Sequence, residues 1–236
     1  MNFANAFTAE RLQEAWNCLL TEFPFAIWET LYSTLLATLF AIVLGLPLGV
    51  LLVTGEQGGI RPLPRPLMSF LNVIINLLRS VPFIILMVMI IPLTRVIVGT
   101  SVGTVASIVP LTVAAFPFIA RLVESSLREV NPNIIETAQS IGATPWQIVT
   151  HVMLPESVPS LITNITLAIT TIMGYTAMSG AVGGGGIGKL ALAYGYQRYR
   201  LAVLYLAVIV LVIITQLIQS LGTWAAKKCD KRLKNR

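Results

Sequence analysis

Long runs without a charged side chain set the hydrophobic pattern of this chain. Four runs exceed the roughly 20 residues that a helix needs to cross the hydrocarbon core of a bilayer. They are residues 30–55, 96–120, 157–188 and 201–226, and a fifth run, residues 66–94, is interrupted only by Arg79. Backbone N–H and C=O groups find no hydrogen-bond partner in the hydrocarbon core, so runs of this length favour continuous helices, in which these groups bond to one another. The pattern predicts an all-α, polytopic membrane protein with about five transmembrane helices.

Glycines and one arginine modify this picture locally. Gly45 and Gly49 have the GxxxG spacing that lets a neighbouring helix approach closely. Residues 179–188 contain six glycines, a density at which a helix is not stable, so the fourth span should end there in a tight external loop. We expect Arg79 to reach the headgroup region or to pair with a neighbouring helix.

Polar residues define three regions of the chain. Residues 1–25 form a predicted N-terminal external or interfacial segment, a short amphipathic helix with Trp16 and Phe23. Residues 26–226 form the predicted membrane domain, and residues 227–236 a basic tail. Inside the membrane domain, one sizeable polar insertion covers residues 122–156 and holds the acidic residues Glu124, Glu129, Glu136 and Glu156.

The basic residues predict an orientation in the membrane. Hydrophobic residues make up 56% of the chain and charged residues 11%, against about a quarter in soluble domains. Six basic residues follow position 226, which favours a cytoplasmic C-terminus and, with an odd number of spans, an external N-terminus. On this topology the cytoplasmic side also holds Arg61, Arg65, Arg121 and Arg128, and the outside holds Arg11, Arg95, Lys189, Arg198 and Arg200. The net charge of +6 is therefore a topology signal and does not indicate nucleic-acid binding.

Patterns of enzyme chemistry are missing from the sequence. Residues 183–190 nearly match the phosphate-binding loop GxxxxGK[ST], but Leu190 stands where a hydroxyl would bind magnesium. Cys18 and Cys229 fall on opposite predicted sides of the membrane, and His151 is the single histidine. We expect no catalytic residue, metal site or cofactor in this chain. The predicted spans also lack the mid-membrane acid of ion-coupled carriers, so energy for transport would have to come from another subunit.

The polar insertion is the predicted point of contact with such a subunit. Residues 133–150 have helical character, with an apolar face that includes Ala138, Ile141 and Gly142. Residues 144–151 are predicted to restart as a second short helix, and Pro155 to close the unit. Two short helices joined around the small residues Gly142 and Ala143 would make a compact cytoplasmic projection. A helix pair lying flat on the lipid surface fits the same periodicity.

The residues of the insertion resemble a known motif. Glu136-Thr-Ala-Gln-Ser-Ile-Gly142, followed after nine residues by Val152-Met-Leu-Pro155, is similar to the "EAA" loop of bacterial ABC importer permeases, EAA-x3-G-x9-I-x-L-P. Thr137 and Val152 depart mildly from that pattern. The resemblance implies short cytoplasmic coupling helices that dock on an ATPase, within residues 133–155. The matching positions are Glu136, Ala138, Gly142, Leu154 and Pro155, with Ala143 beside them.

Further segments resemble the methionine importers of that family. They start at Arg79, Ile91 and Tyr175, and with the loop they extend the resemblance over residues 26–226. The resemblance implies a homodimer with its pore on the two-fold axis, in the bacterial cytoplasmic (inner) membrane. It also implies two cytoplasmic subunits that bind ATP and magnesium, an external substrate-binding lipoprotein, and L- and possibly D-methionine as substrate.

The pore itself leaves a weaker signal. Tyr175, Met178 and Ser179 come just before the glycine break, and a flexible thioether such as Met178 can form an apolar plug that repacks. Ordinary helix packing explains these residues equally well. Two rival functions stay open: a secondary carrier or channel for small amino acids that needs no ATPase, and a membrane anchor for a complex.

Overall fold

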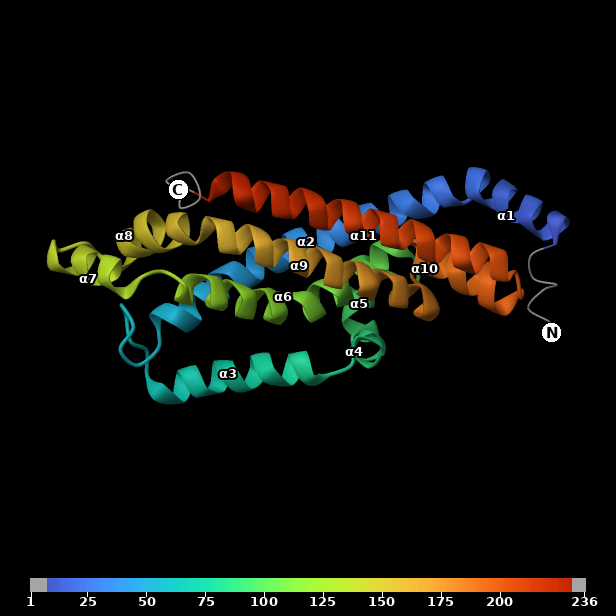
Figure 1. Cartoon of the computed structure of the whole chain (residues 1–236). Coiled ribbons are helices and arrows are strands. Elements are labelled where there is room, and N and C mark those ends of the chain that lie inside the picture. Colours follow the sequence, from blue (N-terminus) through green and yellow to red (C-terminus); the bar gives the residue numbers. More distant parts are fainter. Residues whose placement is uncertain (1–7, 231–236) are drawn as a thin grey trace. The chain divides into compact units, whose positions relative to one another are not determined.

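The computed structural model describes residues 8–230, in which helices joined by short turns and loops are present and no strand occurs (Figure 1). The helices are α1 (Ala9–Thr21), α2 (Phe23–Thr54), α3 (Arg65–Ser80), α4 (Phe83–Met89), α5 (Ile91–Val98), α6 (Thr104–Arg128), α7 (Pro132–Ser140), α8 (Pro145–Gln147), α9 (Leu154–Ser179), α10 (Gly186–Leu190) and α11 (Leu201–Cys229). Two π-helical turns, Ile148–Met153 and Ala191–Gln197, and a 3-10 turn at Gly180–Val182 join some of them. The first seven residues and the tail residues 231–236 lie outside the described part.

Four helical runs are long and apolar enough to cross a membrane: Phe23–Thr54, Thr104–Arg128, Pro145–Val182 and Leu201–Cys229. They confirm four of the predicted spans. The fifth is the pair α3 and α4, which bends by 105°. Pro82 causes the break, since it lacks an N–H and forces Val81 into an extended conformation (φ −76°, ψ 125°). Arg79 is exposed in the last turn before this bend.

The described chain falls into two compact units. The first unit combines the described residues up to Thr38 with Pro82–Val113 and Ile169–Ile218. The second unit combines Leu39–Val81, Ala114–Ala168 and the described residues from Gln219 onward. All five basic residues predicted to be external belong to the first unit, whereas the polar insertion and the described basic residues predicted to be cytoplasmic belong to the second. The two units therefore group the basic residues in the same two sets as the predicted topology, and the orientation in the membrane stays a prediction.

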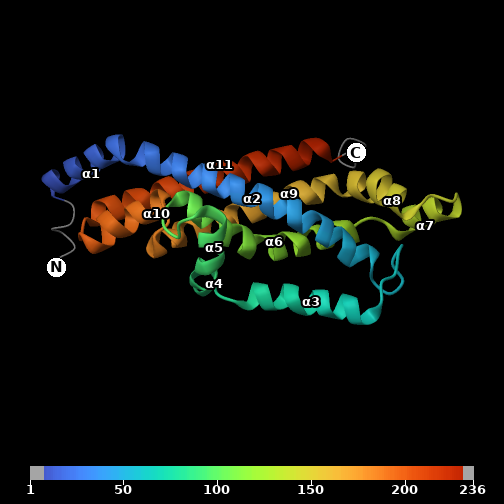
Figure 2. The same ribbon diagram turned by 180° about the vertical axis from the view of Figure 1, so that it is seen from behind.

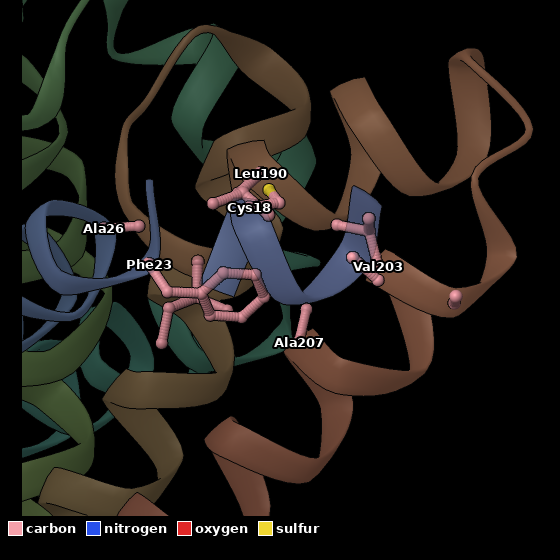
Figure 3. Packing of buried hydrophobic residues seen from close by; sticks show 9 residues of the cluster. Cys18, Phe23, Ala26, Leu190, Val203 and Ala207 are labelled. Atoms are coloured by element: carbon pink, nitrogen blue, oxygen red, sulfur yellow. The ribbon is translucent and has the colours of Figure 1, made fainter. Parts of the chain in front are cut away.

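The core of the first unit begins at α1. Ala15 and Cys18 are buried on the inner face of this helix, next to Phe23 at the start of α2. They pack with small and branched side chains of α10 and α11, including Val203 and Ala207 (Figure 3). Trp16 on the opposite face is exposed. The N-terminal segment is thus the amphipathic helix that the sequence predicts, with its inner face against the protein.

The core of the second unit depends on a close approach of α2 and α6. A Cβ added to Gly49 would lie 2.6 Å from the carbonyl oxygen of Ala120, and one added to Gly45 would lie 2.8 Å from that of Phe116. Both distances are shorter than real Cβ contacts, so only glycine fits. The GxxxG spacing of α2 thus has the packing role that the sequence indicates.

Candidate functional site

The first helix that lies wholly within the polar insertion is α7, and its start is well capped. The Asn131 side chain accepts a hydrogen bond from the Asn133 N–H at 3.0 Å, and Pro132 occupies the first helical position. Both residues are favoured at a helix start because the first N–H groups have no partner inside the helix. Figures 1 and 2 show α7 beyond the ends of α6 and α8, at one end of the second unit.

Gly142 ends α7 in a left-handed turn. Its φ is +81°, its N–H donates to the Gln139 carbonyl at 2.9 Å, and the Ala143 N–H donates to the Ala138 carbonyl at 3.0 Å. This pair of bonds is the Schellman motif, in which glycine is preferred because other residues are strained at positive φ. The backbone conformation at position 142 therefore requires glycine. This reason differs from the one that the sequence suggests, namely that a small residue fits closely into a groove of a partner protein.

The second half of the insertion corrects the prediction of a separate short helix closed by Pro155. Helical structure restarts at Pro145 and runs without a break to Val182, so Pro155 lies inside the fourth span. Proline at such a position lacks an N–H and collides with the carbonyl four residues earlier, here that of His151. A π-helical turn, Ile148–Met153, contains that carbonyl and widens the helix just before the proline.

A capping box fixes the start of this long helix. The Thr144 hydroxyl accepts from the Gln147 N–H at 3.4 Å, while the Gln147 side-chain oxygen accepts from the Thr144 N–H at 2.8 Å. The same oxygen also lies 3.0 Å from the Thr144 hydroxyl. The turn between Gly142 and Pro145 is consequently defined on both sides, by the Schellman motif before it and the capping box after it.

The turn presents apolar side chains to its surroundings. Ile141 is 81% exposed and Trp146 is 74% exposed, on either side of Gly142. Ala138, one turn earlier in α7, is buried against the unit together with Ile148 of the π-helical turn. The structure therefore separates Ala138 and Ile141, which the sequence places on one face. Trp146 is a surface residue that the motif does not include, although an exposed tryptophan in a polar insertion is a recognisable signal.

The motif residues divide into two groups. Glu136, Gly142 and Ala143 belong to the outer part of the insertion, and the exposed Glu136 carboxylate has no partner within residues 8–230. Leu154 and Pro155 lie at the base. Pro155 lines a pocket of about 290 Å³, and the other residues around it include Val152, Ile134 of α7, Glu156 of α9, Cys229 of α11 and Asp230 just after it. The predicted site is thus an exposed tip, with a base in contact with two other helices.

A cluster of charges lies on the same unit, at the end of α6. The Arg121 guanidinium donates to Asn72 Oδ1 at 2.6 Å and to Asn76 Oδ1 at 3.2 Å, both on α3, and to Glu124 at 2.6 Å. These bonds join α6 to the polar side of α3. The sequence does not reveal the contact, because its partners are separated by more than forty residues.

Arg128 extends this cluster toward the insertion. It pairs with Glu124 at 2.9 Å and with Glu56, in the turn after α2, at 2.8 Å. Arg128 is the last residue of α6, three residues before the cap of α7. The charged cluster therefore connects the end of α6 to α3 and to the turn after α2.

A polar cavity of about 510 Å³ lies near the same end of the second unit. Residues after α6, from the first half of α9 and from the end of α11 form its walls. Its polar lining residues include Glu129, Ser160, Thr163, Asn164, Thr223 and Lys227. Charges of both signs and several hydroxyl groups make the cavity suited to water and small polar solutes.

The predicted pore residues have different environments in the first unit. The Tyr175 ring stacks on Phe83 of α4, with centroids 4.8 Å apart and planes inclined by 9°. Met178 is half-exposed, at 47%. Ser179 is fully buried, and its hydroxyl donates to the Thr176 carbonyl at 2.7 Å. The structure brings Tyr175 to the bent segment, and it leaves the Met178 thioether at a surface.

The glycine run forms a tightly held turn. Helix α9 gives way at Ser179 to a 3-10 turn, and Gly183 and Gly186 have φ values of +90° and +77°. The Glu29 carboxylate accepts bonds from the Thr104 hydroxyl at 2.5 Å and from the Gly186 N–H at 2.8 Å. The helix break is thus confirmed, and Glu29 is a residue whose role the sequence did not reveal.

Comparisons with known proteins agree with these features. The family model described as "binding-protein-dependent transport system inner membrane component" matches residues 41–235. A probable D-methionine transport system permease protein of Vibrio cholerae is 46% identical over 207 residues, 88% of this chain and 92% of that protein. A methionine import system permease protein of Bacillus subtilis is 44% identical over 216 residues, 92% of this chain and 97% of that protein.

Solved structures give the same picture. An inward-facing crystal structure of a methionine ABC transporter has a chain that superimposes with a TM-score of 0.88 at 45% identity, covering 90% of this chain and 98% of that chain. An amino acid ABC transporter crystallised with histidines has a TM-score of 0.75 at 16% identity, covering 94% of this chain and 100% of that one. The second likeness concerns the fold alone.

Proposed function

Because the chain belongs to the family of binding-protein-dependent transport system inner membrane components, we propose that it is the permease subunit of an ATP-driven methionine importer. Two copies form the pore, and two cytoplasmic subunits bind ATP and magnesium. An external lipoprotein delivers L- or D-methionine to a complex in the inner membrane. The names of the relatives and their coverage of almost the whole chain support this assignment.

The exposed turn of the insertion carries the proposal for energy coupling. Ile141 and Trp146 lie at the surface on either side of Gly142, and Glu136 has a free carboxylate nearby. A large apolar side chain and a tryptophan at the tip of a polar segment are suited to a protein groove, because buried aromatic anchors dominate interfaces. When the ATPase subunits close, the docked turn moves with them, and the helix that starts at Pro145 moves as its direct continuation.

Co-purification from membranes tests this docking. We expect Ile141→Asp and Trp146→Ala each to weaken association with the ATPase subunit about thirtyfold, the effect of losing an interface anchor of about 2 kcal/mol. ATP-dependent uptake should fall in parallel. Trp28→Ala is the matched control, since this tryptophan near the start of α2 is similarly exposed, at 63%, and belongs to the first unit, whereas the insertion belongs to the second. Wild-type assembly in both tip variants would refute coupling through this turn.

Uptake measurements test the substrate and the energy source. Cells that express the complete complex should accumulate labelled L- and D-methionine and leave labelled histidine outside. Removal of the ATPase subunit should abolish this uptake. Persistent methionine uptake without the ATPase would instead favour a secondary carrier, and equal uptake of methionine and histidine would exclude the methionine assignment.

A further inference from the structure

The turn before α11 has a strained backbone and an aromatic surface. Tyr199 has a φ of +55°, the left-handed region that a residue with a bulky side chain rarely adopts. Tyr196 is 68% exposed and Tyr199 66% exposed. Such strain destabilises the fold, and it persists only where the surrounding structure enforces it. We call residues 194–200 the tyrosine–arginine turn.

The turn is held firmly from inside the first unit. The Arg200 N–H donates to the Tyr194 carbonyl at 3.2 Å, and the Tyr199 N–H donates to the Tyr196 carbonyl at 3.4 Å. A Cβ on Gly195 would lie 2.7 Å from that of Leu204, so the turn is pressed against the start of α11. Tyr194 packs against the core cluster that contains Cys18 and Val203. The two exposed tyrosines therefore stand on a rigid base.

The charges of the turn are ordered as well. The Arg198 guanidinium lies 4.4 Å above the centre of the Tyr194 ring, and within the described part of the chain it has no acidic partner. Arg200, by contrast, is 3.7 Å from the Glu14 carboxylate of α1. Stacking on an aromatic ring keeps the Arg198 side chain extended and its N–H groups available.

We propose that the tyrosine–arginine turn is a docking surface for an acidic patch on the substrate-binding protein. This inference rests on the proposed function: the family description names a binding protein, and the charge pattern predicts that this turn is external. Tyrosine and arginine are the residues that most often dominate protein interfaces. A turn that is already ordered loses little conformational freedom on binding, which favours a protein partner over a fluid lipid surface.

Binding of the purified binding protein to the complete complex in nanodiscs of neutral lipid tests the proposal. We expect Arg198→Glu and Tyr196→Ala each to raise the Kd about thirtyfold, and the effect of Arg198→Glu to shrink at high salt. Arg198→Lys should fall between these variants and wild type, because lysine keeps the charge and loses the planar fork. Arg95→Glu is the matched control: it is an exposed arginine on the same predicted side.

Each outcome has a distinct meaning. An unchanged Kd in Arg198→Glu, or an equal loss in Arg95→Glu, would overturn the docking surface while leaving methionine import intact. An effect of Arg198→Glu that appears only in nanodiscs of anionic lipid, with an unchanged Kd in neutral lipid, would identify a lipid contact and also overturn the docking surface. If the wild-type complex neither bound the binding protein nor imported methionine, the proposed function itself would fail.

Discussion

At the scale of single residues, Gly142 shows how a motif position can have a different physical reason from the one its size suggests. Its backbone is left-handed, and an added Cβ would meet no atom of the described chain within 4 Å. Within the chain, glycine is therefore required for its backbone conformation and not for lack of space. A partner protein packed against the turn would add a second requirement, that the residue be small.

Substitutions at Gly142 distinguish the two requirements. Gly142→Ala should lower the free energy of unfolding by about 1 kcal/mol, whereas Gly142→Asn should lower it less, since asparagine tolerates positive φ. Both should reduce methionine uptake if the ATPase packs against this turn. Thermal unfolding of the solubilised permease and uptake assays would show the two effects. Full uptake by Gly142→Asn would restrict the role of the glycine to the backbone.

Glu29 should stabilise the first unit through its two hydrogen bonds. Glu29→Ala leaves the Gly186 N–H and the Thr104 hydroxyl without their acceptor, so we expect a loss of about 2 kcal/mol in unfolding free energy. Thermal denaturation in detergent measures this loss. Glu10→Ala serves as a control because Glu10 is exposed on α1. Equal effects of the two substitutions would show that the carboxylate bonds contribute nothing specific.

At the scale of elements, the sequence identifies the spans better than it identifies their ends. Runs without charge locate four spans because each charge in hydrocarbon is costly, whatever the helix packs against. The start of the fourth span was misplaced because Pro155 looks like a terminator. The π-helical turn that accommodates it depends on local hydrogen bonding, which leaves no clear pattern in the residues. The bend at Pro82 was similarly hidden inside an apolar run.

The candidate site was also only partly predictable. The motif from Glu136 to Pro155 was found because its spacing is contiguous along the chain. Contacts between distant residues, such as those of Arg121 with α3 or of Glu29 with the glycine turn, leave no such spacing. The exposure of Trp146 depends on how α7 folds back onto the π-helical turn, which only tertiary structure determines.

The close contact of α2 and α6 provides a test at this scale. Gly49→Ala should destabilise the permease by about 1–3 kcal/mol, since the added methyl overlaps the Ala120 carbonyl and the helices have to separate. Gly174→Ala is the matched control in another span. It has open space around the added Cβ and should be neutral or stabilising, because alanine favours helix by about 1 kcal/mol. Unfolding temperatures that fall equally in both variants would contradict the packing argument.

At the scale of the whole molecule, loops predicted to lie on one side of the membrane belong to one unit, and loops predicted to lie on the other side belong to the second unit. Arg95, Lys189 and Arg198 belong to the first unit, and Arg61 and Arg128 to the second. Charge counting could not show which loops associate with one another. The structure adds this association, and it places α1 and the tyrosine–arginine turn, both predicted to be external, in the same unit.

Cysteine labelling tests the orientation of the two units. In intact cells, a membrane-impermeant maleimide should label Gln197→Cys in a Cys18→Ser, Cys229→Ser background. It should label native Cys229, which is exposed, only after permeabilisation. Cys18 should react slowly, because burial raises the pKa of its thiol and so lowers the fraction of reactive thiolate. Rapid labelling of Cys229 in intact cells would show that the C-terminus is external and would contradict the predicted topology.

The glycine turn of the first unit has a consequence for hydrogen–deuterium exchange. Six glycines in ten residues normally indicate a mobile linker whose amides exchange at once. Here the amides of Gly184, Gly186 and Ile187 donate to Ser179, Glu29 and Thr30 at 2.8–2.9 Å. We therefore expect this turn to be protected like the helices beside it, and to lose that protection in Glu29→Ala before the helices do.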